Sequence, residues 1–158
     1  MTNVEEARSW PDESRVATYR EHGSGHVLAD QLFTETDVSF VRAECRIVLR
    51  DIGFGEPRAS TFVYAINECL TNVIRHGGGH GWFILISDAT RLVALIIDHG
   101  PGASMTIPEQ EPANDAVHGR GLWLARLMVD RMALTTGPDG TTVRLEIAHA
   151  WSGERPVG

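Results

Sequence analysis

Three polar residues share one side of a predicted amphipathic helix. Glu68, Asn72 and His76 lie four residues apart in the stretch INECLTNVIRHGGG, and this spacing places them on one helix face. The apolar positions of the same stretch fall elsewhere; they are Val63, Ile66, Leu70, Val73 and Ile74. A carboxylate, an amide and an imidazole in a row indicate that this side of the helix meets a polar ligand or a reacting group.

Two glycine-bearing stretches point to the chemistry of that ligand. In DHGPG, residues 98–102, the Asp98 carboxylate can project from the end of an apolar strand, while Gly100 and Gly102 let the backbone approach a ligand. HGRGL, residues 118–122, opens a helix whose first N–H groups and positive dipole end suit a phosphate. Each stretch alone is a weak signal, but together with the polar stripe they predict a pocket for a phosphate-bearing molecule.

Composition limits how such a pocket can work. The chain has 158 residues, 42% of them hydrophobic, which is enough for one well-buried domain. Its net charge of −7 and scattered arginines argue against a nucleic-acid surface. All 14 basic residues are Arg, so a Walker-type loop and the eukaryotic-type protein kinase site, which both need a lysine, are excluded.

Location is predicted from the same composition. Cys45 and Cys69 both fall in predicted helices, and no signal peptide or apolar run of membrane-spanning length is visible. The sequence therefore predicts a cytoplasmic protein with reduced thiols and no membrane contact.

The periodicity of the chain gives the elements that must position these residues. The first half is predicted to hold a strand at 26–33, a helix that follows Thr34, Thr36 and Asp37 and stops at Gly53, and a helix at 56–76. The second half is predicted to hold strands at 82–87 and 92–98, a helix at 121–132, and a last pair of strands around the turn GPDG. In TTVRLEI, alternation predicts a half-buried strand.

This order predicts an α+β fold. It is a two-layer α/β sandwich with a mixed, mainly antiparallel sheet and helices on one face. A Rossmann fold is excluded because strands and helices do not alternate and no Gly-x-Gly-x-x-Gly follows the first strand. The predicted domain covers residues 26–148, between a flexible N-terminal arm at 1–25 and a C-terminal tail at 149–158.

Four stretches in register carry a family resemblance. NECLTNVIRHG, DHGPG, GRGLWLARLMVD and GPDGTTVRLEI resemble the Bergerat-type nucleotide site shared by gyrase, heat-shock chaperone, histidine kinase and mismatch-repair ATPases. The likeness is closest to the small bacterial anti-sigma factor serine-protein kinases and the related switch kinases of stress and sporulation pathways. It extends from about Val27 to Ile147.

The resemblance implies a role for each matching residue. Glu68 would be the general base, Asn72 would bind Mg²⁺ through its amide oxygen, and Asp98 would accept the adenine amino group, with Thr142 beside it through a water. Gly119 and Gly121 would bring backbone donors to the phosphates, helped by Arg120 because no lysine exists, with Arg75 a weaker second candidate. The complete implied ATP-binding set is Asn72, His76, Asp98, Gly100, Gly102, Gly119, Arg120, Gly121, Leu122 and Thr142.

The implied function is that of a Mg²⁺-ATP-dependent serine/threonine protein kinase. It would phosphorylate an anti-anti-sigma-type antagonist, sequester a sigma factor and act as a homodimer. A second hypothesis is a binding module that controls a phosphatase or sigma factor by contact, because the lid segment Ala103–His118 has no Lys or Arg and contains Glu109, Glu111 and Asp115. A third is a stand-alone histidine-kinase catalytic domain, although no helical hairpin with a phospho-acceptor His is visible.

Other interpretations of the same residues remain open or fail on missing partners. Glu68 and Asn72 could be solvated helix residues, and His76 could interact only with the helix dipole. A zinc site at His76 and His80 lacks further ligands, and a lipase-type HGGG lacks a Gly-x-Ser-x-Gly nucleophile. A nucleophilic Cys69 lacks a paired base.

Overall fold

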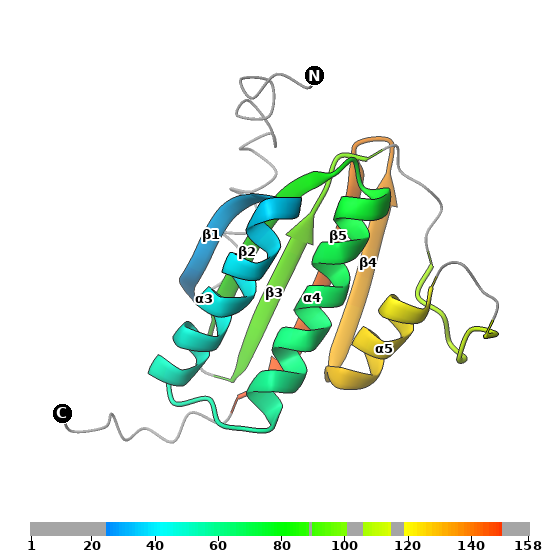
Figure 1. Ribbon diagram of the computed structural model, residues 1–158. Coiled ribbons are helices and arrows are strands. Elements are labelled where there is room, and N and C mark those ends of the chain that lie inside the picture. The colour runs from blue at the N-terminus through cyan, green and yellow to red at the C-terminus, as the bar shows by residue number, and fades with distance from the viewer. Residues whose placement is uncertain (1–24, 89, 101–105, 115–118, 150–158) are drawn as a thin grey trace.

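The elements follow the order predicted from periodicity. The computed structural model describes residues 25–88, 90–100, 106–114 and 119–149. They form β1 (His26–Thr34), the 3-10 helix η1 (Glu35–Asp37), α3 (Val38–Asp51), α4 (Arg58–His76), β2 (His80–Ser87), β3 (Arg91–Ile97), α5 (Arg120–Met128), β4 (Arg131–Gly137) and β5 (Gly140–Ala148) (Figure 1). Most of the predicted arm and tail lies outside the described residues, and no described helix is long and apolar enough to cross a membrane.

The strands form one sheet in the order β1-β2-β3-β5-β4. All four described pairings are antiparallel, so the sheet is more uniform than the mixed one predicted. Helices α3, α4 and α5 cover one face of this sheet (Figure 1). The main core lies between the two layers and includes the fully buried Phe33, Phe62 and Phe83. The predicted two-layer α+β fold is confirmed.

Helix α4 forms because its apolar residues recur at helical spacing. Val63, Ile66, Leu70 and Val73 are buried against the sheet, and Ile74 packs against their edge. The polar stripe keeps Glu68 and Asn72 half-buried and leaves His76 exposed. The helix ends where the Gly77 N–H donates to the Val73 carbonyl at 2.8 Å, and Gly78 and Gly79 follow with positive φ.

Helix α5 is shorter than predicted. It ends at Met128, whereas periodicity predicted a helix up to Met132. Val129 is already extended, with φ −122 and ψ 161, and the Asp130 N–H donates to the Glu146 carbonyl at 2.9 Å. Local apolar spacing alone assigns residues 131 and 132 to the helix. Because β4 pairs with β5 from Arg131 onward, these residues are in a strand instead.

Strand β5 is buried on both faces, although alternation predicted burial of only one. Val143, Leu145 and Ile147 belong to the main core, as predicted, but Thr142 and Glu146 on the other face are also buried. The strand lies between β3 and β4, so both of its edges are paired. Its polar face is further covered through the ion pairs of Glu146.

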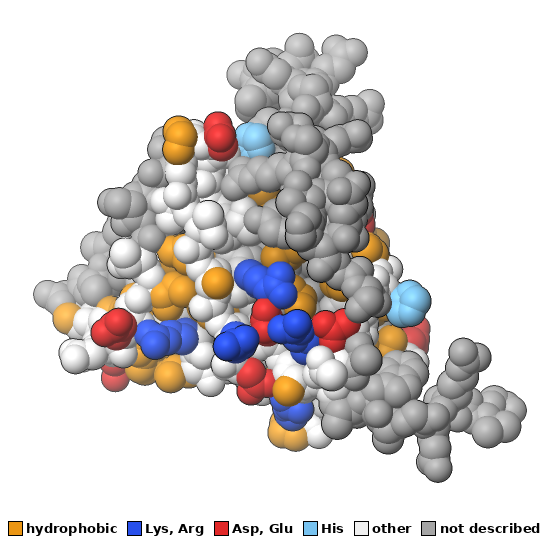
Figure 2. All heavy atoms as spheres, turned by 180° about the vertical axis from the view of Figure 1, so that it is seen from behind, with side chains coloured by type: hydrophobic (Ala, Val, Ile, Leu, Met, Phe, Trp, Pro, Cys, Tyr) orange, Lys and Arg blue, Asp and Glu red, His pale blue; other side chains and the backbone are white. Residues whose placement is uncertain are grey.

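The helix-free face of the sheet carries a second apolar cluster. Ile84, Val93, Leu95 and Ile97 are buried there, with Trp82 and Ile86 packed against them. Figure 2 shows this side of the molecule, where basic and acidic side chains are grouped together. Arg91 and Arg144 both pair with Glu146 on this face, at 3.2 and 2.6 Å.

Candidate functional site

Asp98 lies directly after β3, where its carboxylate is held by two backbone donors. Its Oδ1 accepts hydrogen bonds from the N–H of Gly100 at 3.0 Å and of Thr141 at 3.1 Å. The side chain is only 6% exposed. A buried carboxylate fixed in this way is oriented by the backbone, as a group that discriminates one ligand must be.

Three glycines make room for this carboxylate and its loop. A Cβ on Gly77 would lie 2.5 Å from Asp98 Oδ2, and a Cβ on Gly100 would lie 2.8 Å from the Gly77 backbone. Gly140, with φ +115, passes directly against the Asp98 backbone. The end of α4, the end of β3 and the start of β5 therefore converge at Asp98, and any side chain at these positions would move it.

Thr141 contacts Asp98 through its backbone. In the β3–β5 register Thr142 is opposite Ile97, which belongs to the apolar cluster on the helix-free face. Side chains of a strand alternate between faces, so Thr141 shares the helix-covered face with Val143. Thr141 also donates its N–H to Asp98 and is 6% exposed. The predicted role of Thr142 stays a prediction, and Thr141 joins it as a neighbour of Asp98.

Glu68 meets the start of α5. A Cβ on Gly121 would lie 2.5 Å from Glu68 Oε2, so the carboxylate occupies the space that a side chain on Gly121 would fill. Two stretches 50 residues apart in sequence are thus brought into contact by the packing of α4 on α5. One turn before Glu68, on the same side of α4, lies Tyr64.

The charge of Glu68 acts on that tyrosine. Glu68 raises the pKa of Tyr64 above its ordinary value, because a neighbouring negative charge disfavours the phenolate, and partial burial acts in the same direction.

The first turn of α5 presents backbone N–H groups beside Glu68. Gly119 caps the helix with φ 95, a conformation that favours glycine, and the first intrahelical bond runs from the Trp123 N–H to the Gly119 carbonyl at 3.0 Å. The N–H groups of residues 120–122 precede that bond, so they have no partner within the helix. The Leu122 side chain is buried in the core, which leaves only its backbone to serve a ligand.

Arg120 contacts the segment before α5. Its guanidinium donates to the Pro112 carbonyl and to Asn114 Oδ1, each at 3.3 Å. Arg126, one and a half turns later, donates to the Pro108 carbonyl at 3.1 Å. Arg120 was predicted to meet phosphate. In the structure its Nη2 donates instead to a backbone and an amide oxygen of the described lid residues 106–114.

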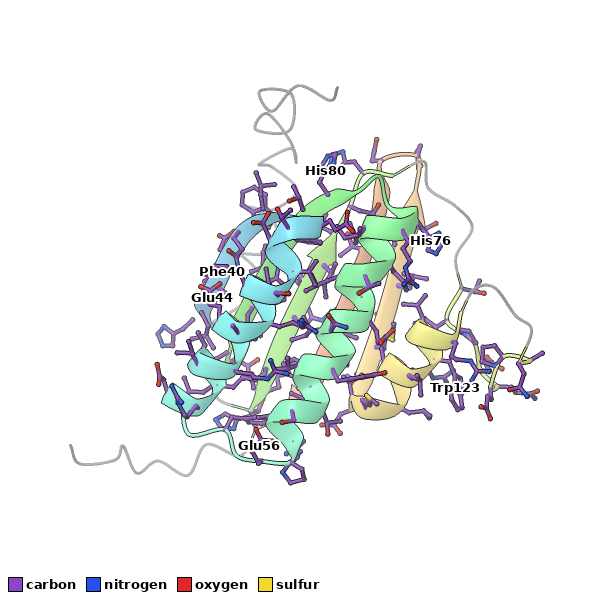
Figure 3. All side chains as sticks on the ribbon, in the orientation of Figure 1. Phe40, Glu44, Glu56, His76, His80 and Trp123 are labelled. Atoms are coloured by element: carbon purple, nitrogen blue, oxygen red, sulfur yellow. The ribbon has the colours of Figure 1, made fainter. Side chains whose placement is uncertain are left out.

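Asn72 lies one turn beyond Glu68 on the same side of α4. Its amide is half-buried, and an amide oxygen beside a carboxylate is a donor set that suits a hard cation such as Mg²⁺. These residues fit the metal only together with oxygens of a ligand, because no group of three or more His, Cys, Asp or Glu gathers among the described residues. His76 lies exposed at the end of the helix, one turn further on (Figure 3).

Several contributors were not recognised in the sequence. Gly77 was taken only as a helix stop, although its missing side chain admits Asp98. Tyr64 could have been found from its position four residues before Glu68. Gly102, predicted to bind ATP, lies outside the described residues.

Cys69 is not placed for nucleophilic chemistry. The side chain is buried, and burial first, then the charge of Glu68, raises the pKa of its thiol to about 12. A thiol of this kind is not ionised at neutral pH.

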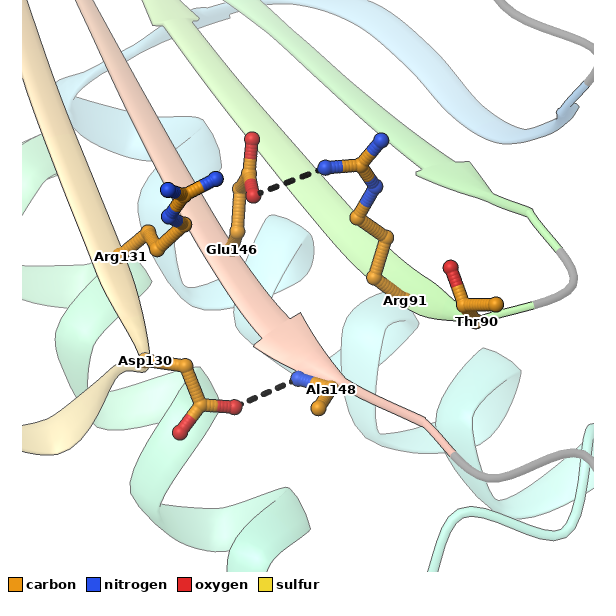
Figure 4. Close-up of a pocket in the computed structure, with 6 residues that line it drawn as sticks. All are labelled: Thr90, Arg91, Asp130, Arg131, Glu146 and Ala148. Atoms are coloured by element: carbon orange, nitrogen blue, oxygen red, sulfur yellow. Dashed lines mark hydrogen bonds and ion pairs between the residues drawn. The ribbon is translucent and has the colours of Figure 1, made fainter.

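A cavity on the opposite face of the sheet is lined mainly by charged residues. It measures about 200 Å³ and is lined by Thr90, Arg91, Asp130, Arg131, Glu146 and Ala148 (Figure 4). Glu146 accepts from Arg91, and Asp130 accepts from the Ala148 N–H at 2.6 Å. None of these lining residues surrounds Asp98, so the cavity is separate from the Asp98 site.

The fold and the converging segments define an ATPase-type domain. Residues 31–147 match the histidine kinase-like ATPase domain family, which covers most of the chain. The chain therefore belongs to that family, as the resemblance of its four stretches predicted.

Two solved structures are similar to this chain. The RsbU and RsbW domains of Rv1364c from Mycobacterium tuberculosis are 22% identical to 75% of this chain, with a TM-score of 0.53. This chain covers 32% of that longer chain, and the likeness concerns the fold. The histidine kinase domain of a blue-light activated histidine kinase from Erythrobacter litoralis EL346 is 18% identical, with a TM-score of 0.45, and the match covers 68% of this chain and 64% of that one. A sequence comparison with curated proteins found no match.

Proposed function

We propose that the protein is a Mg²⁺-ATP-dependent serine/threonine protein kinase of the anti-sigma factor type. Its substrate would be an anti-anti-sigma-type protein, and a sigma factor would be a second partner. One observation carries the proposal: the carboxylate of Glu68 lies against Gly121, at the start of α5. A base is thereby held beside the helix N-terminus that suits a phosphate, with the Asn72 amide one turn away.

Each residue has a defined part in this reaction. The acceptor hydroxyl would give its proton to Glu68 while its oxygen bonds to the γ-phosphorus, and the bond to the bridging oxygen would break to release ADP. The N–H groups at the start of α5 would hold the phosphate oxygens. Asp98 would accept the adenine amino group, with Thr141 fixing the orientation of the carboxylate. Bound Mg²⁺ would neutralise phosphate charge, and Asn72 would hold it.

Binding and transfer can be tested separately. Titration calorimetry with ATP should show Mg²⁺-dependent binding that Asn72→Ala and Asp98→Asn each weaken. Phosphate from labelled ATP should appear on an anti-anti-sigma-type protein from the same organism. Glu68→Gln should slow that transfer by about 100-fold or more while ATP still binds. Transfer at the full rate after Glu68→Gln would contradict the proposal, and Glu35→Gln, at an exposed residue of η1, serves as a matched control.

The contacts of Arg120 favour a second candidate function. Arg120 is bonded to Pro112 and Asn114, and the described lid residues 106–114 include Glu109 and Glu111 but no Lys or Arg that could reach a phosphate. The protein would then bind ATP without rapid transfer and control a phosphatase or sigma factor by contact.

Partner affinity separates the two candidates. A contact regulator would bind its partner with different affinity in the ATP and ADP states while leaving no phosphate on any protein. Equal affinity in both states would rule it out. Acid-stable phosphate on the partner would instead support the kinase, and acid-labile phosphate would indicate transfer to histidine.

A further inference from the structure

The apolar cluster on the helix-free face of the sheet is buried as deeply as the main core. Its four members are at most 5% exposed; they are Ile84, Val93, Leu95 and Ile97. The helices of the described residues all lie on the other face (Figure 1), and the hydrophobic neighbours of the cluster, Trp82 and Ile86, are themselves in the sheet. An antiparallel sheet with one layer of helices commonly leaves its other face polar and wet. This face therefore needs a cover that the described helices and strands do not supply.

Polar side chains mark where the cover must lie. On β5, next to the cluster, Arg144 and Glu146 form an ion pair with each other. On β1, at the other side, Asp30 accepts a hydrogen bond from Trp82 Nε1. The apolar strip is thus the width of β2 and β3, about 10 Å, and runs about 13 Å along β2 from Ile86 to Trp82. One short segment of chain is enough to cover it.

The chain reaches β1 directly beside this strip. Gly25 precedes β1, and a Cβ on Gly25 would lie 2.6 Å from the Ile86 Cγ2. Residues 1–24 therefore join the described part of the chain at one end of the apolar strip. A fully extended chain spans at most about 3.6 Å per residue, so four residues cross the length of the strip and the remaining ones are ample.

The other stretches outside the described residues are less suited to this place. Residues 150–158 follow His149, whose ring lies 5.3 Å from that of Phe54 in the main core, on the helix-covered face. The internal stretches 89, 101–105 and 115–118 hold at most five residues each. Such short connections cannot cross the strip and return. The segment before β1 is thus the occupant that the geometry favours.

Residues 1–24 also contain the side chains that such a cover needs. Val16 and Tyr19 are apolar or aromatic and lie close enough in sequence to Gly25 to reach the strip. Charged residues surround them in the stretch DESRVATYRE. A segment of this kind can turn its apolar side chains to the sheet and keep its charges in water.

We propose that residues 1–24 fold back over the helix-free face of the sheet and cover the apolar cluster, with Val16 and Tyr19 in contact with it. Composition and the lack of a sustained period predicted a flexible arm there, and the buried cluster gives the arm a fixed place instead. Glu68 and Asn72 lie on α4, on the other face, so the covered sheet leaves the candidate site open. The inference does not depend on the proposed kinase activity.

Thiol labelling of the full chain tests the cover. Val93→Cys puts a thiol into the cluster, whereas Cys45 and Cys69 are buried and burial raises the pKa of each thiol to about 12, so they stay unlabelled at neutral pH. A maleimide should label Cys-substituted residue 93 slowly. Adding Val16→Asp and Tyr19→Asp should speed the labelling at least about tenfold, because charged side chains would not remain against the apolar strip. Trp151→Asp with Val157→Asp is the matched control in the tail and should leave the rate unchanged.

Three results would overturn the proposal. Rapid labelling of the Val93→Cys chain without further changes would show that the face is open. Acceleration by the tail substitutions and not by those at residues 16 and 19 would make residues 150–158 the occupant. A labelling rate that falls as the protein concentration rises would identify a second copy of the chain as the cover.

Cross-linking gives a second test that does not need the arm to be released. A short bismaleimide should join Tyr19→Cys to Val93→Cys within one chain. Leu127→Cys, at a residue of α5 that is 63% exposed, replaces Val93→Cys in the control pair and should give no such product. Equal yields from both pairs, or no product from the first, would contradict the proposed position. Continued protection of Cys45 and Cys69 verifies that each variant is folded.

Discussion

At the scale of single residues, the candidate site depends on side chains that are missing. The Asp98 carboxylate occupies space that is open only because residue 77 is a glycine. The backbone of Gly77 has φ −101, which any residue can adopt. The glycine is therefore required by its neighbour and not by its own conformation.

We expect Gly77→Ala to weaken ATP binding by about tenfold or more, because the new methyl group would push Asp98 Oδ2 from a distance of 2.5 Å. Titration calorimetry measures the loss. Gly55→Ala is the matched control, since a Cβ there has nothing within 4 Å. Unchanged affinity in a folded Gly77→Ala chain would show that Asp98 does not contact the nucleotide.

The effect of Glu68 on Tyr64 makes a separate prediction. Removing the charge with Glu68→Gln should lower the pKa of Tyr64 toward its ordinary value, because the negative charge is the main cause of the rise. Tyr64 is one of 2 tyrosines, so ultraviolet titration in a Tyr19→Phe background reports on it alone. Glu56→Gln is the control. An unchanged titration curve after Glu68→Gln would mean that the two side chains are apart in solution.

At the scale of elements, the sequence is informative wherever the signal is local. The apolar period of α4 predicted both its buried face and the polar stripe, because each depends on residues within a few turns. The end of α5 could not be predicted this way. Val129 and Met132 continue the apolar spacing, yet the β4–β5 ladder takes residue 131 onward.

Register explains why Thr141, which was not singled out in the sequence, meets Asp98. The alternation of β5 already placed Thr141 with Val143, but only the pairing of Ile97 with Thr142 shows which face meets Asp98. Pairing is a non-local property, and a shift by one residue exchanges the two faces of a strand.

Helix α5 also fixes the segment before it, and this can be measured. Replacing Arg120 and Arg126 together by Ala removes their side-chain hydrogen bonds to residues 108, 112 and 114. Each exposed bond contributes about 0.5–1.5 kcal/mol, so amides in residues 106–114 should exchange roughly fivefold faster or more. Hydrogen exchange with mass spectrometry measures this change. Arg46→Ala on α3 is the control, and equal exchange in both variants would show that the arginines do not hold the segment.

At the scale of the whole molecule, an inner strand that is buried on both faces must accommodate a buried charge. Glu146 on β5 lies between Arg91 of β3 and Arg144 of its own strand. Burial works to raise the pKa of Glu146, but the hydrogen bonds and charges of Arg144 and Arg91 outweigh it, so the pKa lies below its ordinary value. Folding is therefore coupled to ionisation of this carboxyl group.

The sign of this coupling sets the pH dependence of stability. The folded state holds Glu146 ionised more strongly than the unfolded chain does, so its contribution is complete above the ordinary pKa of 4.5 and is lost as pH falls through the lower folded value. Glu146→Gln should cost about 1–3 kcal/mol at pH 7, because Arg91 and Arg144 lose their charged partner. In urea unfolding below pH 4.5 the wild type should lose stability more steeply than Glu146→Gln. Glu109→Gln, in an exposed segment, should follow the wild type, and parallel curves for wild type and Glu146→Gln would contradict the role given to this ion-pair network.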